Sequence, residues 1–127
     1  MRPTASELVA VAVGALVGTG ARLAIDTLVG QPISTLAINV IGSFALGLLV
    51  ARLWSSAAPW LRAGLGAGLL GSFTTFSALT VTLVELGFSW NAALYLGLSL
   101  VLGLGAAWAG LRIGAPRRVP PIEGATE

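Results

Sequence analysis

The residues best suited to chemistry in this chain lie in one short segment, Gly71 to Ser77, whose sequence is Gly-Ser-Phe-Thr-Thr-Phe-Ser. Glycine disfavours helix through its backbone entropy, and threonine loses rotamer freedom in a helix, so this segment predicts a helix break. At membrane depth a break is tolerated only where protein or a cavity surrounds it, and its freed carbonyl groups can coordinate a cation. A packing kink that binds nothing is the alternative for this segment.

Two sets of polar residues recur at four-residue spacing, and each set therefore falls on one face of a helix. The sets are Thr35, Asn39 and Ser43, and Asn91, Tyr95 and Ser99. Hydrogen bonds between helices, which contribute about 0.6 kcal/mol each, would explain a single serine. Asn39 is harder to explain in this way, because its amide needs several partners in a membrane and offers two N–H donors to an anion.

The composition limits the reactions that these residues can support. The chain has no cysteine, no histidine and, because all seven basic residues are arginine, no lysine. Disulfides, thiolate or imidazole metal ligands and histidine proton relays are therefore excluded. No convergent set of acid, base and nucleophile is visible, so we do not expect an enzyme. The net charge of +2 is too small to indicate a nucleic-acid partner.

Hydropathy places the elements that carry these residues in a membrane. Of 127 residues, 56% are hydrophobic and only 9% are charged, against about 25% charged in an average soluble domain. Four helices long enough to cross a hydrocarbon core of about 30 Å are expected at 7–29, 32–54, 61–87 and 90–113. A secretory signal peptide is the alternative for the first segment, although Arg2 alone would form its positive region. Within that segment we expect Arg22 to pair with Asp26, one turn later.

The links between helices predict the organisation of one domain, residues 1–113. Links of two residues, 30–31 and 88–89, predict antiparallel hairpins of helices one and two and of helices three and four. Glycine pairs at four-residue spacing predict close helix packing and oligomerisation. These pairs are Gly14/Gly18, Gly64/Gly68 and Gly110/Gly114. The proline-containing tail, 114–127, is expected to be disordered.

Arginine distribution predicts the orientation. Six arginines fall on the side of the membrane shared by the two termini and the central loop, and none falls on the other side. Cytoplasmic loops carry the excess of basic residues, so both termini, including the tail, are predicted to be cytoplasmic in a bacterial-type plasma membrane.

Together these motifs resemble the Fluc (CrcB-like) family of fluoride-specific ion channels. The resemblance rests on Gly20-Ala21 with Arg22, on Thr35-Leu-Ala-Ile-Asn-Val-Ile-Gly-Ser-Phe44 and on Gly71 to Ser77, and it covers residues 7–113. It implies an all-α integral membrane subunit of four helices with a broken third helix. Two such subunits would form an antiparallel dimer with two fluoride pores at their interface, through which fluoride leaves the cell passively.

The resemblance also implies roles for individual residues. The pore-lining residues would be Asn39, Phe76, Thr75, Ser43, Tyr95, Ser99 and Arg22. Backbone carbonyls of Gly71 and Thr74 would hold a structural sodium ion (Na+) at the dimer centre. The chemistry agrees with these roles, because neutral donors can replace the water that fluoride loses and still release the ion. The edge of the Phe76 ring carries the positive part of its quadrupole and could face an anion.

Two features depart from the family pattern. Leu79 stands where the family has a second phenylalanine, and Thr82 stands where a glutamate is common. In addition, an antiparallel homodimer requires one sequence to insert in both orientations, which favours balanced loop charges rather than six arginines against none. We therefore expect one subunit of a heterodimer with a homologue of opposite orientation, and a homodimer is the alternative.

Two other classes suit four helices in a short chain. A small multidrug-resistance-type proton antiporter needs a membrane-embedded acid, whereas Glu7 and Glu85 lie near predicted helix ends. A non-transporting membrane assembly subunit would show no flux of any anion.

Overall fold

The computed structural model describes residues 2–115, and this part of the chain is entirely α-helical apart from one π-helix and short turns. The elements are α1 (Ala5–Val29), α2 (Ile33–Leu53), α3 (Pro59–Arg62), the π-helix η1 (Ala63–Leu70), α4 (Gly71–Phe73), α5 (Phe76–Leu86) and α6 (Trp90–Gly114). Four stretches are long and apolar enough to cross a membrane, and Pro59–Leu86, which spans α3 to α5, is the third. The four membrane helices predicted from the sequence are confirmed, with ends that differ by at most two residues.

Local sequence explains where the helices begin and end. The Thr4 hydroxyl accepts a hydrogen bond from the Glu7 amide at 3.3 Å, and the Glu7 carboxylate accepts one from the Thr4 amide at 2.7 Å. This capping box starts α1 at Ala5, two residues earlier than expected. Gly30 and Gly87 have φ values of 76° and 61°, which end α1 and α5 in conformations that other residues rarely adopt. Gly114, expected in the tail, is the last residue of α6, and 116–127 lie outside the described residues.

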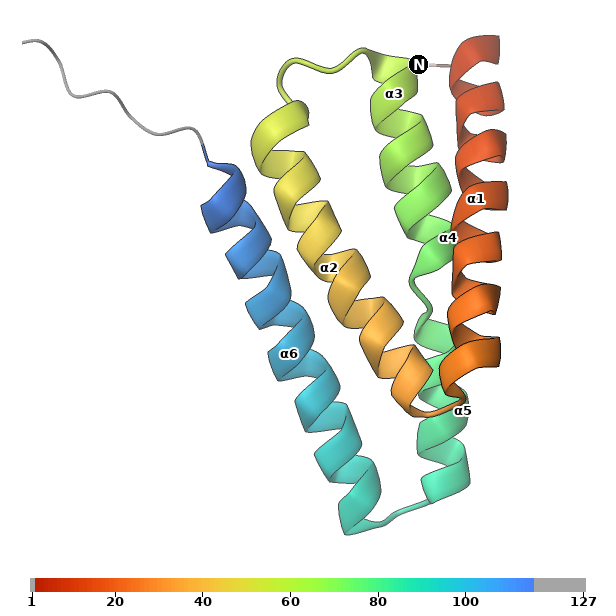
Figure 1. Cartoon of the computed structure of the whole chain (residues 1–127), viewed down its shortest axis with the longest axis vertical. Helices are drawn as coiled ribbons and strands as arrows, with labels where there is room; N and C mark the ends of the chain where they lie inside the picture. The colour runs from red at the N-terminus through yellow and green to blue at the C-terminus, as the bar shows by residue number, and fades with distance from the viewer. Residues whose placement is uncertain (1, 116–127) are drawn as a thin grey trace, which may run out of the picture.

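The predicted hairpins exist, but they are not the closely packed pairs. The chain reverses between α1 and α2 and again between α5 and α6, whereas α1 packs along α3, η1 and α4, and α2 packs along α6 (Figure 1). Both ends of the described chain lie at the same end of the bundle (Figure 1). The helices of each closely packed pair therefore run parallel to each other. In the sequence, one helix of opposite direction separates the two members of each pair.

Glycines decide this pairing, since each glycine pair predicted from spacing lies against the backbone of another helix. A Cβ atom on Gly14 would overlap the Gly64 carbonyl oxygen, and one on Gly68 would lie 2.6 Å from the Val11 carbonyl oxygen. A Cβ atom on Gly110 would likewise overlap the carbonyl oxygen of Phe44. Two helix backbones can approach this closely only where both helices carry small residues. The helices that carry them therefore pack together, rather than the helices that the two-residue links join.

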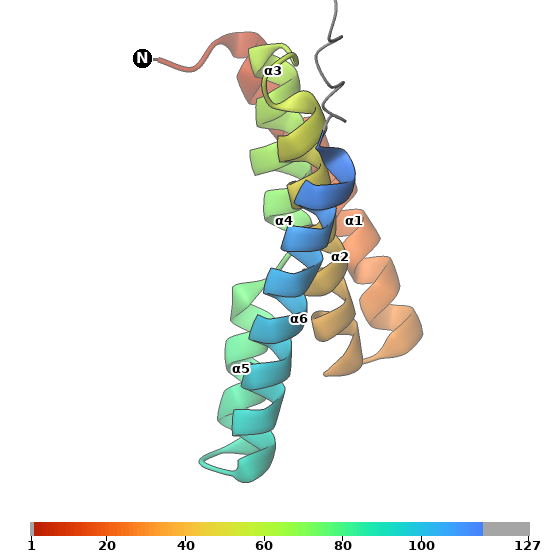
Figure 2. The same cartoon turned by 90° about the vertical axis from the view of Figure 1, so that its left-hand side faces the viewer.

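The bundle is thin and has little core of its own. The buried hydrophobic side chains are Ile38, Leu70, Phe73 and Leu79. Large apolar side chains on all four membrane helices are exposed, as expected where lipid or another protein chain replaces water. Figure 2 shows the same bundle from the side, with the α5–α6 hairpin extending past the turn between α1 and α2.

Candidate functional site

The third membrane helix is interrupted inside the segment singled out above. Thr74 (φ −73°, ψ 155°) and Thr75 (φ −146°, ψ 116°) are extended, and they separate α4 from α5. The Thr75 hydroxyl then starts α5 by accepting a hydrogen bond from the Ala78 amide at 3.2 Å. The Thr74 hydroxyl turns back and donates to the Leu70 carbonyl at 2.9 Å. The Thr74 side chain thus bonds back to the helix that ends, and the Thr75 side chain caps the helix that begins.

Asn39 of α2 holds this interruption through both ends of its amide. Its Oδ1 accepts a hydrogen bond from the Thr75 amide at 2.8 Å, and its Nδ2 donates to the Thr75 carbonyl at 2.9 Å. Asn39 therefore takes the place of a backbone partner for an extended residue that is itself buried. The expectation of two free N–H donors needs correction, because one of them is bound to Thr75 and one is left.

The carbonyl groups of residues 71 to 74 lose the amide donors that a continuous helix would provide, and Gly71 and Thr74 are the first and last of them. In such a helix the Thr75 amide would donate to the Gly71 carbonyl and the Ala78 amide to the Thr74 carbonyl. Instead these amides donate to the side chains of Asn39 and Thr75. The Gly71 and Thr74 carbonyls are thus available to another partner.

The interruption forms one wall of a cavity of about 340 Å³ between α2 and the third membrane helix. Its lining includes the sequence-predicted residues Asn39, Ser43, Gly71, Thr74, Thr75 and Phe76. The sequence analysis missed four further lining residues, which are Gly42, Leu46, Gly66 and Leu70. Helical spacing could have found them, because 39, 42 and 46 share one face of α2, and 66, 70 and 74 share one face of the third helix.

Two small residues bring the interruption close to its neighbours. A Cβ atom on Gly42 would overlap the Thr74 methyl group, so only glycine lets α2 approach at this point. On the other side, the Ser72 hydroxyl lies 2.7 Å from the Gly68 carbonyl oxygen and 3.1 Å from the Ala15 carbonyl oxygen of α1. The end of the π-helix is thereby tied to α1.

The aromatic residues of the segment point in different directions. Phe73 is buried, whereas Phe76 is 78% exposed at the rim of the cavity. Leu79, which stands at the position of the second phenylalanine in the family pattern, is 6% exposed and belongs to the core of this chain. Phe76 is therefore the aromatic ring of this segment that is open to a ligand or to another chain.

The remaining predicted site residues do not line this cavity. Tyr95 donates its hydroxyl hydrogen to the Pro32 carbonyl at 3.0 Å, and Ser99 donates to the Tyr95 carbonyl at 2.7 Å. Arg22 is half-buried on α1. Its expected partner Asp26 has a buried Oδ1 atom without a hydrogen-bond partner, so the ion pair predicted between them is not formed through that atom.

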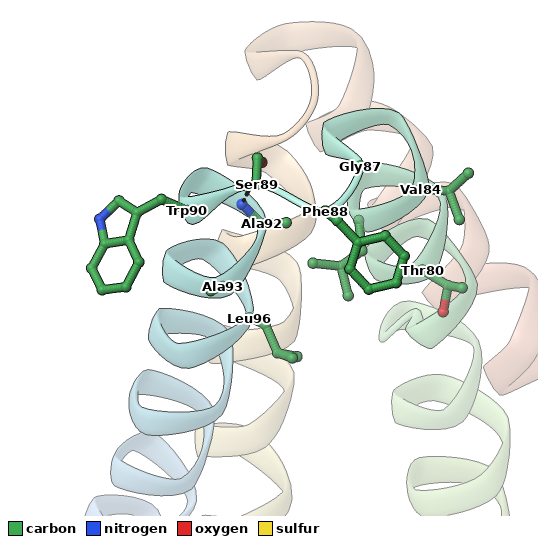
Figure 3. A pocket seen from close by; sticks show the side chains of 10 residues that line it. Thr80, Val84, Gly87, Phe88, Ser89, Trp90, Ala92, Ala93 and Leu96 are labelled. Atoms are coloured by element: carbon green, nitrogen blue, oxygen red, sulfur yellow. Dashed lines mark hydrogen bonds between the residues drawn. The ribbon is translucent and has the colours of Figure 1, made fainter.

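The cavity is uncharged, and a few polar groups interrupt a mainly apolar lining. No Asp, Glu, Arg or Lys is among its lining residues, which offer one free amide N–H of Asn39, the Ser43 hydroxyl, carbonyl groups and the Phe76 ring. A larger cavity of about 830 Å³ lies between α5 and α6, where Phe88, Val84 and Leu96 contribute apolar walls (Figure 3). Its two hydroxyl groups, on Thr80 and Ser89, already donate to the carbonyls of Phe76 and Leu86, so the smaller cavity is the candidate site.

These features define a multi-pass membrane protein whose site is built around an interrupted helix. Residues 9–111 match the family described as CrcB-like protein, Camphor Resistance (CrcB), and the chain belongs to this family. A relative from Halalkalibacterium halodurans, named Fluoride-specific ion channel FluC 2, is 37% identical and covers 98% of this chain and 99% of its own. A relative from Paracoccus denitrificans, named Fluoride-specific ion channel FluC, is 41% identical and covers 82% of this chain and 90% of its own.

Family membership confirms two predictions made from the sequence. The resemblance to Fluc channels is confirmed, and so is the expectation that the chain is not an enzyme, because this is a family of ion channels. The antiporter has no support in the described site, since no acidic side chain lines the cavity beside Asn39.

Proposed function

We propose that this chain is a subunit of a fluoride-selective channel, through which fluoride leaves the cell passively. The observation that carries the proposal is the uncharged cavity at the helix interruption, in a chain whose relatives are named fluoride-specific channels. Fluoride is small and strongly hydrated, so entry requires donors that replace water. The free Asn39 N–H and the Ser43 hydroxyl are such donors, and as neutral groups they also allow the ion to leave.

Two subunits would complete the pathway as an antiparallel dimer. Phe76 exposes 78% of its surface at the rim of the cavity, where a second subunit would cover it. Thr75 and Ser43 would then line the pore beside Asn39, while Tyr95, Ser99 and Arg22 would extend the polar path on α6 and α1. Membrane lipid would surround the remaining apolar surface.

A sodium ion is proposed to join the two subunits at their centre. The available carbonyls of Gly71 and Thr74 suit a hard cation, which prefers oxygen ligands, and two subunits would supply four of them. Among residues 2–115 no group of His, Cys, Asp or Glu could hold a metal, so the ligands would be backbone oxygens. Flux that is unchanged after sodium is replaced by N-methylglucamine throughout purification and assay would argue against this ion.

The distribution of arginine favours a heterodimer with a homologue of opposite orientation. Among the described residues, Arg52, Arg62 and Arg112 lie at the end of the bundle that holds both chain ends, whereas the α1–α2 and α5–α6 turns have no basic residue. This asymmetry favours one orientation, with both termini cytoplasmic. Equal insertion in both orientations, measured by topology tags on the chain expressed alone, would overturn the heterodimer.

The experiment that tests the function is fluoride efflux from liposomes that contain the purified chain, measured with a fluoride electrode. We expect fluoride to leave much faster than chloride, either with the chain alone or after addition of an oppositely oriented homologue. The first outcome assigns a homodimer and the second a heterodimer. Absence of fluoride flux under both conditions would contradict the proposal.

Phe76 and Phe73 should respond in opposite ways to substitution. Phe76→Ile changes an exposed ring, so we expect fluoride flux to fall while the midpoint of thermal unfolding stays nearly unchanged. Phe73→Ala removes a buried ring and should lower the free energy of unfolding by about 3–5 kcal/mol. Flux and thermal unfolding measured on the same preparations separate the two effects. Equal flux in Phe76→Ile and the parent chain would exclude this ring from the pathway.

A further inference from the structure

A second surface feature lies on a different face of the bundle from the candidate site. A groove of about 690 Å³ runs between α1 and the first half of the third membrane helix. Its walls include Val9, Val13 and Val17 from α1 and Trp60, Leu65 and Leu69 from the other side. No residue lines both this groove and the candidate-site cavity beside Asn39. The groove is therefore separate from the proposed ion pathway.

The length of the groove matches one leaflet of a bilayer. It extends along α1 from Ala5 to Val17, a separation of twelve residue steps, or about 18 Å at 1.5 Å per step. Half of a hydrocarbon core of about 30 Å is about 15 Å. Since α1 starts at Ala5, the groove begins near the membrane surface and ends near the midplane. One acyl chain of a single leaflet has this reach.

The open end of the groove carries positive charge. Arg2 precedes α1, and Arg62 follows the lining residues Trp60 and Leu61. Arg62 uses one nitrogen, Nη1, to donate to the Trp54 carbonyl at 3.1 Å, which leaves other guanidinium N–H groups free. The carboxylate of Glu7 accepts hydrogen bonds from the amide and the hydroxyl of Thr4, at 2.7 and 2.9 Å, and lies close enough to Arg62 to interact with its charge. Its negative charge offsets one of the two arginines, so these three side chains together carry a net charge of +1.

These groups suit the headgroup of an anionic lipid above the acyl chain. Arginine binds phosphate with several donors at once, and the half-exposed Trp60 has an indole N–H that commonly lies at headgroup depth. A zwitterionic headgroup would offset part of this attraction with its own positive charge. The charge at the open end therefore favours an anionic lipid.

We propose that the groove between α1 and the first half of the third membrane helix binds one anionic phospholipid, with an acyl chain on Val9, Val13 and Val17 and its phosphate near Arg2 and Arg62. The lipid occupies the leaflet at the end of the bundle that holds both chain ends. The proposal does not depend on which ion the channel conducts.

The test is native mass spectrometry of the full chain, extracted from vesicles of equal parts phosphatidylglycerol and phosphatidylcholine. We expect phosphatidylglycerol to be retained at least threefold over phosphatidylcholine. Val13→Trp should fill the groove and abolish retention, whereas the matched control Val101→Trp, at an exposed site on α6, should retain lipid as the parent does. The double variant Arg2→Gln and Arg62→Gln should keep a lipid but lose the preference.

Three results would overturn the proposal. These are equal retention of the two lipids by the parent chain, equal retention by Val13→Trp and Val101→Trp, or an unchanged preference in the double arginine variant. If Val13→Trp does not elute as the parent does on size exclusion, Val9→Trp fills the same groove from a more exposed position, 63% against 55%, and replaces it.

Discussion

Replacement of Asn39 by alanine should abolish most of the fluoride flux, with a decrease of at least about tenfold. The Asn39 amide pairs with both the amide and the carbonyl of Thr75, which is buried. Alanine would leave these two backbone groups without partners, at about 1–3 kcal/mol each. The extended conformation of Thr74 and Thr75 would lose its support, and the cavity and the Gly71 carbonyl would move with it. Efflux from liposomes, measured with a fluoride electrode, gives the size of the effect.

Two further variants distinguish two roles of Asn39, which are support of the Thr75 backbone and supply of a polar group to the cavity. Asn39→Asp has nearly the same shape and keeps an acceptor for the Thr75 amide, but it loses the donor to the Thr75 carbonyl, so its flux should also fall strongly. Ser43→Ala removes a hydroxyl from the same cavity wall without breaking a contact to the interruption, and it should reduce flux less. A similar loss in Ser43→Ala and Asn39→Ala would show that the cavity needs both donors and that support of Thr75 is not the main role.

Replacement of Gly110 by valine should cause a large loss of stability, because Gly110 is buried where α6 packs against α2. A Cβ atom at Gly110 would overlap the Phe44 carbonyl oxygen and would lie 2.8 Å from the Leu48 amide nitrogen. Because these atoms belong to the backbone of α2, they cannot move aside like a flexible side chain, and α6 would have to separate from α2. We expect about 3 kcal/mol of destabilisation and a fall of about 10 °C in the unfolding midpoint. Tryptophan fluorescence in detergent follows the transition.

The matched control is Gly105→Val on the same helix, five residues away. Nothing lies within 4 Å of a Cβ atom built on Gly105, so the change tests the helix propensity of valine against glycine without a packing conflict. Its midpoint should stay close to that of the parent chain. If both variants unfold at the same temperature, close contact of α2 and α6 does not determine stability.

Periodicity and composition alone determined the class and the elements of this protein. Long runs of uncharged residues predict four membrane helices. In lipid, a helix is one of the few structures in which the backbone N–H and C=O groups all find hydrogen-bond partners within the protein. The segment from Gly71 to Ser77 and the position of Asn39 identified the residues of the site, because polar groups at this depth need a specific reason. Both conclusions depend on local sequence, and local sequence was enough for them.

Only the tertiary structure decided which helices pack together and what Asn39 does. The short links favour pairing of α1 with α2, but backbone contact at Gly14 and Gly110 pairs α1 with η1 and α2 with α6. The hydrogen bonds of Asn39 reach a residue 36 positions away, and the burial of Leu79 likewise depends on distant neighbours. Spacing along a helix gives the face on which a residue lies, but the partner of that face depends on how the backbones approach in space.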